Sequence, residues 1–125
     1  MKKFKLLVLS AVLGLFLMNS VPTFAAVLFS QNIGGTNTQS STSTLGSGGR
    51  YITASGTNGT ATATARKIIK FFPDSNEASI VVTGGQWSQA YFTSQAYNSD
   101  GISQGYYIQW TSNSNQSTGT VRFEG

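Results

Sequence analysis

Apolar and polar residues alternate with a period of two over most of the chain from Arg50 onward. In residues 60–70 three threonines alternate with three alanines. Period-two alternation with β-branched residues favours a strand over a helix, despite the alanines. The last apolar residues, Val121 and Phe123, are likewise separated by one polar position and are expected to point inward.

Turn residues separate these alternating segments. Asn58-Gly59 tolerates the positive φ angles of a tight turn, which predicts a hairpin between residues 51–57 and 60–70. Asn98-Ser99-Asp100-Gly101 predicts a second hairpin loop, and residues 72–76 predict a surface turn around Pro73. Hairpins between consecutive strands imply a meander with largely sequential neighbours. Further strands are expected at 27–33, 78–83, 86–97, 102–112 and 120–124.

The fold predicted from this pattern is all-β. About six or seven short strands, with no capped segment of helical period, indicate a small antiparallel β-sandwich or barrel. Residues 50–125 form this domain. Residues 26–49 precede it as an N-terminal strand and a flexible segment rich in Ser, Thr and Gly.

The first 25 residues have a different pattern. Three lysines among the first five residues precede an apolar run from Leu6 to Met18, and Pro22, Thr23 and Ala25 then lead to the expected cleavage site. This order is typical of a secretory signal peptide, and the run is short for a membrane span. We therefore expect a cleaved leader at 1–25, and a secreted, extracellular protein exported by the general route of a bacterium.

Residues 36–49 read TNTQSSTSTLGSGG, with Leu45 as the one large apolar residue. Such a tract buries little surface to offset the entropy of ordering it, which predicts an exposed loop or flexible linker. The alternative is a mobile arm that becomes ordered on contact with a partner or a membrane.

Composition changes this picture in two ways. The formal net charge of +4 includes the three leader lysines, so five basic and four acidic residues remain beyond residue 25. Clustered basic residues are what attract phosphate, so this near balance removes the argument for nucleic acid as a partner. The chain also has no cysteine, so it must be stabilised by packing without disulfides.

The residue types needed for most catalysis are also missing. The chain has no histidine, which is the usual general base and transition-metal ligand, and no cysteine, which supplies the thiol nucleophile. A carboxylate pair, as in glycosidases, would have to come from Asp74, Glu77, Asp100 and Glu124, which lie in turns or at the chain end. We expect a non-enzymatic protein with no cofactor and no metal site.

Aromatic residues are the best candidates for function. In residues 86–97 one face would carry the Trp, Tyr and Gln side chains and the other the Ser, Ala and Phe side chains. Either face could be the wet one. If the aromatic face is exposed, it would form a flat platform for sugar rings or another protein, whereas the alternative is ordinary cross-strand packing. The candidate ligand-binding residues are Trp87, Gln89, Tyr91, Gln95, Tyr97 and Tyr107.

Beyond the expected leader, the only charge cluster is Arg66, Lys67 and Lys70, followed by Phe71 and Phe72. It is a candidate contact for a polyanion such as teichoic acid or a lipid headgroup. The alternative is an edge strand that its charges protect from aggregation.

Three functions follow from these observations. The leading hypothesis is a secreted binding protein that recognises a cell-envelope polysaccharide or an extracellular protein through its aromatic β face. A bacteriocin-like or membrane-active toxin is the second, although membrane contact is not favoured. Self-association into an extracellular matrix through sheet edges is the third.

Overall fold

The structure is a computed structural model that describes residues 26–125, and the predicted leader lies outside the described residues. Within this range the chain forms nine strands and no helix, so the all-β prediction is confirmed, with more strands than expected. No helix of the described part is long and apolar enough to cross a membrane. The strands are β1 (Val27–Gly34), β2 (Asn37–Gln39), β3 (Ser43–Thr44), β4 (Gly48–Asn58), β5 (Ala61–Lys67), β6 (Ser75–Val82), β7 (Trp87–Ser94), β8 (Gly105–Ser112) and β9 (Thr118–Glu124).

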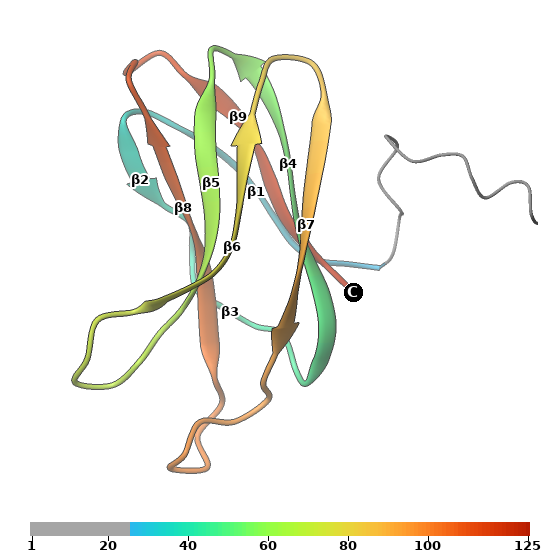
Figure 1. Cartoon of the computed structure of the whole chain (residues 1–125), viewed down its shortest axis with the longest axis vertical. Helices are drawn as coiled ribbons and strands as arrows, with labels where there is room; N and C mark the ends of the chain where they lie inside the picture. The colour runs from blue at the N-terminus through green and yellow to red at the C-terminus, as the bar shows by residue number, and fades with distance from the viewer. Residues whose placement is uncertain (1–25) are drawn as a thin grey trace, which may run out of the picture.

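The strands form two antiparallel sheets that pack face to face (Figure 1). One sheet has the order β1-β9-β4-β7. The other has the order β2-β8-β5-β6, with β3 also pairing with β8. The expected meander is wrong, because β5 and β6 are the only consecutive strands among those described that pair with each other.

Of the three predicted turns, the one at 72–76 connects paired strands of one sheet, whereas the other two connect different sheets. Gly59 has a φ of +74°, as expected for Asn58-Gly59, yet β4 before it and β5 after it belong to opposite sheets. The hairpin prediction at this position is therefore wrong. The 98–101 loop joins β7 to β8 across the sandwich in the same way. A tight turn reverses the chain locally, but its chemistry does not decide whether the next strand pairs with the previous one or crosses to the facing sheet.

The core lies between the two sheets and follows the predicted alternation. The three alanines of β5 point inward and are buried, as are Val121 and Phe123 of β9. Trp110 of β8 fills the space that the small residues leave, since it pairs with Ala63. A Cβ atom on Gly119 would lie 2.7 Å from the Trp110 ring, so the indole also lies against the backbone of the facing sheet. Small residues on both sides thus make room for one large ring.

Two of the additional strands come from the polar tract 36–49. β2 and β3 both pair with β8, and Leu45 between β3 and β4 is buried. The Arg50 guanidinium donates two hydrogen bonds to the Leu45 carbonyl oxygen, at 3.0 and 2.7 Å. The segment is held by backbone pairing, which a composition almost without apolar residues does not reveal.

Candidate binding site at one end of the sandwich

The orientation of β7 shows which of its two faces is exposed to solvent. Phe92 and Ser94 are buried in the sandwich, so the Ser/Ala/Phe face is the inner one and Tyr91 is exposed on the outer one. β7 ends at Ser94. Gln95 and Tyr97 consequently lie in the loop beyond the strand, and they do not continue a row with Trp87, Gln89 and Tyr91.

The outward aromatic residues of β7 are engaged by their neighbours. The Arg122 guanidinium carbon lies 4.2 Å from the centre of the Trp87 ring. The Tyr91 ring meets the Tyr51 ring edge-on, with centroids 5.6 Å apart. It also covers Gly49, where an added Cβ would lie 2.7 Å from the Tyr91 hydroxyl oxygen. Trp87 and Tyr91 thus each contact a side chain of a neighbouring strand, and Tyr91 remains exposed.

Tyr107 lies apart from this face. It is buried in the other sheet, and its hydroxyl donates a 2.7 Å hydrogen bond to Asp74 Oδ2. Burial raises the pKa of Tyr107, and the hydrogen bond to Asp74 raises it further. Arg66 lies on the same side, 5.9 Å from the Tyr107 ring centre, and donates to the Asp74 carbonyl oxygen. Both residues thus anchor the loop between β5 and β6.

The charge cluster does not protect an edge strand. β5 lies between β8 and β6, so that interpretation is wrong. The strand ends at Lys67. Arg66, inside the strand, lies against the Tyr107 ring. Lys67 and Lys70 lie at the end of the sandwich.

Two loops project from this end, residues 68–74 between β5 and β6 and residues 95–104 between β7 and β8 (Figure 1). Hydrogen bonds join them. Gln104 Nε2 donates to the Ile68 carbonyl oxygen at 2.7 Å, and Lys67 Nζ donates to Gln95 Oε1 at 3.2 Å. Within the first loop, the Ile69 N–H donates to the carboxylate that also accepts from Tyr107.

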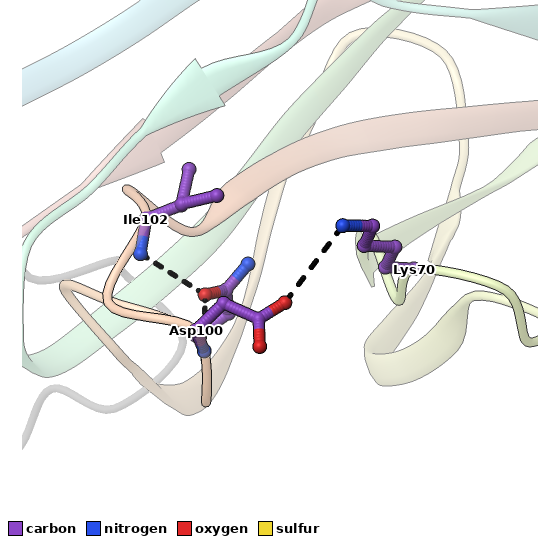
Figure 2. Close-up of polar contacts among 4 residues, drawn as sticks. Lys70, Asp100 and Ile102 are labelled. Carbon is purple, nitrogen blue, oxygen red and sulfur yellow. Dashed lines mark hydrogen bonds and ion pairs between the residues drawn. The ribbon is translucent and has the colours of Figure 1, made fainter.

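The 95–104 loop has its own internal supports. Asn98 Oδ1 accepts hydrogen bonds from the N–H groups of Asp100 and Ile102, at 2.9 and 3.1 Å, which is the local reason for a tight turn here. The Gln95 N–H donates to the buried Tyr106 hydroxyl at 2.8 Å. The Lys70 Nζ–Asp100 Oδ2 ion pair, 3.9 Å long, spans the two loops (Figure 2).

An open cleft of about 680 Å³ lies between the loops. It brings together two residues of the predicted ligand set, Gln95 and Tyr97, and two of the predicted cationic set, Lys67 and Lys70. Its full lining is Lys67, Ile68, Ile69, Lys70, Phe71, Phe72, Gln95, Tyr97, Asn98, Ser99, Asp100 and Gln104.

The same end carries more than half of the exposed large hydrophobic residues of residues 26–125. Five of the nine exposed large hydrophobic residues in this range lie on the two loops, and Phe71 and Phe72 are 90% and 72% exposed. Exposed apolar groups gathered at one end of a molecule are candidates for an interaction site. We define the loop-end surface as Lys67, Ile68, Lys70, Phe71, Phe72, Tyr97 and Ile102.

Sequence reasoning placed neither phenylalanine in a site, and it placed Ile102 on a strand. Ile102 precedes β8, which begins at Gly105, and its side chain is exposed. Phe71 has a φ of +66°, unusual for a residue with a Cβ, and Lys70 Nζ lies 5.2 Å from its ring centre. The usable signal was two adjacent phenylalanines outside the alternation, immediately before Pro73.

The acidic residues of the described part are dispersed. Asp74 holds the 68–74 loop and Asp100 pairs with Lys70. Glu124 on β9 is fully buried, where Thr53 Oγ1 donates to its Oε1 at 3.1 Å and Arg122 lies 3.7 Å from its Oε2. Residues 26–125 contain no group of three side chains able to hold a metal ion.

Comparisons of the chain with protein-family models, with curated proteins and with solved structures found no match.

Proposed function

We propose that this protein is a secreted, non-enzymatic binding protein that attaches to the bacterial cell envelope through its loop-end surface. The proposal rests on one observation: two loops, joined by hydrogen bonds and an ion pair, present exposed apolar side chains and lysines at the same end of the molecule. The predicted leader supports secretion, and the absence of histidine and cysteine supports a role without catalysis. The proposed contact surface thus moves from the β7 face to the loop end.

Energetics support a partner at this end. Complete burial of one phenylalanine side chain contributes about 1.5–3 kcal/mol, and Phe71 and Phe72 are both left largely in water. Phe71 also has backbone strain of about 1–2 kcal/mol from its positive φ. Neither feature stabilises the free protein, so both are consistent with a surface kept for contact.

The loops are organised before any partner arrives. In the first loop, Asp74 accepts a hydrogen bond from the Ile69 N–H, and the Ile68 carbonyl oxygen accepts one from Gln104. In the second loop, Asn98 accepts a hydrogen bond from the Ile102 N–H. Binding would therefore cost little additional ordering of the backbone, which favours affinity for a given contact area.

A sedimentation assay with isolated bacterial envelopes tests the proposal. Residues 26–125 should pellet with the envelopes, and a Phe71→Gly/Phe72→Ser variant should stay largely in the supernatant. Glycine suits the positive φ at position 71, so this variant removes both rings with little risk to folding. Val81→Ser is the matched control, because Val81 is an exposed apolar residue on β6.

Two results would contradict the proposal. One is a wild-type protein that stays in the supernatant. The other is a folded double variant, checked by its thermal unfolding curve, that pellets as fully as the wild type.

A further inference from the structure

The loop-end surface has a chemistry that selects among envelope components. We infer that it docks on the interface of an anionic lipid bilayer, with Phe71 and Phe72 inserted among the acyl chains. This inference rests on the proposed function, since it names the component that the same surface binds.

The shape of the surface favours a bilayer over a folded partner. Phe71 and Phe72 lie on one projecting loop, and Tyr97 and Ile102 lie on the other, all of them exposed. A protein partner would need pockets to receive separate projecting rings, whereas the acyl region of a bilayer accepts them without a complementary shape. Aromatic side chains with adjacent lysines are also typical of the membrane interface.

The charges are placed for anionic headgroups. Lys67 and Lys70 line the same cleft as the two phenylalanines, and Lys67 Nζ has a neutral partner, Gln95 Oε1, at 3.2 Å. The long lysine side chains can keep their ammonium groups at the headgroups while the rings go deeper. The acidic side chain that lines the cleft is Asp100, which is more than half exposed and paired with Lys70.

The pairing of Lys70 with Asp100 makes the inference specific. If headgroup phosphates compete for Lys70, Asp100 opposes binding by repulsion. Asp100→Asn should then strengthen vesicle binding, whereas Lys67→Ala or Lys70→Ala should weaken it. The contribution of one lysine near an anionic membrane corresponds to about a five-fold change in affinity.

The test uses vesicles of equal parts phosphatidylglycerol and phosphatidylcholine, with pure phosphatidylcholine vesicles as the neutral comparison. Residues 26–125 should float with the anionic vesicles, and Phe71→Gly/Phe72→Ser should bind more than about ten-fold more weakly. Insertion is measured with Phe72→Trp, whose added fluorescence should be quenched by lipids brominated on their acyl chains. Val81→Trp, on β6, is the matched control and should not be quenched.

The outcomes separate the two proposals. Binding to isolated envelopes without binding to anionic vesicles overturns the lipid inference and leaves the proposed function standing. Binding to neither overturns both. Vesicle binding that is unchanged in the double phenylalanine variant also overturns insertion, as does a Phe72→Trp variant whose added fluorescence brominated lipid does not quench.

Discussion

Ser117 joins three segments of the chain through one hydroxyl group, and its removal should weaken the whole fold. The buried indole of Trp110 on β8 donates its Nε1–H to Ser117 Oγ at 3.0 Å. The same hydroxyl donates to the carbonyl oxygen of Gly35, next to β1, at 2.9 Å. Ser117 is itself 1% exposed, so water does not readily replace its hydroxyl in Ser117→Ala.

The size of the loss in stability follows from the groups that Ser117→Ala leaves without a hydrogen-bond partner. A buried donor without an acceptor costs about 1–3 kcal/mol, and the Trp110 indole N–H becomes such a donor. Gly35 is only partly buried, so water can satisfy its carbonyl at a smaller cost. We expect Ser117→Ala to lower the free energy of unfolding by about 2 kcal/mol. For a domain of this size that corresponds to a fall in Tm of about 8–16 °C.

Urea unfolding followed by tryptophan fluorescence measures this change. Ser114→Ala is the control, because the Ser114 hydroxyl accepts only an exposed backbone hydrogen bond from Gln116 in the same loop. It should change stability by less than about 0.5 kcal/mol. If Ser117→Ala is as stable as the control, the account of Trp110 as a hydrogen-bonded core residue fails.

The remaining predictions concern strand packing, a surface ion pair and pH. Gly119→Ala should destabilise the fold by about 1–3 kcal/mol in thermal unfolding, because its Cβ would lie 2.5 Å from a β4 carbonyl oxygen; an unchanged Tm would contradict the close approach of the strands. Asp100→Asn should change the free energy of unfolding by less than about 0.5 kcal/mol, since its pair with Lys70 is more than half exposed; a larger loss in urea would show a structural role. Burial raises the pKa of Tyr106 and of Tyr107, so the folded protein holds these phenol protons more tightly than the unfolded chain. Stability should therefore be complete below the ordinary tyrosine pKa of about 10 and fall as the pH rises above it, and Tyr107→Phe should reduce that fall in urea unfolding at stepped pH.

The sequence predicted the faces of the strands better than their partners. Alternation identified the inner face of β9, because a strand buried on one side must separate apolar from polar residues. In β5 it separated the alanines from the threonines without deciding which face is the inner one. It did not identify the pairing order, because Asn58-Gly59 has the same chemistry in a hairpin and in a connection between sheets. β2 and β3 were missed since their residues are held by backbone pairing with β8.

Only part of the candidate site could be predicted from the sequence. Lys67, Lys70 and Tyr97 were singled out by residue type, but their convergence depends on two loops, one within a sheet and one between the sheets. Tyr107 was included in the ligand set for its residue type. The structure shows that Asp74 and its loop lie over Tyr107. The alternation of residues along a strand cannot predict a contact with a loop from another part of the chain.

The strand order also constrains how the polypeptide can acquire its structure. β9 lies between β1 and β4, and β8 lies between β2 and β5, so one interior strand of each sheet comes late in the sequence. A nascent chain that ends before Gly105 can form only the β4–β7 and β5–β6 pairs. Folding of the sandwich should therefore wait until β8 and β9 have been made and then proceed as one cooperative event dominated by contacts distant in sequence, which slows it.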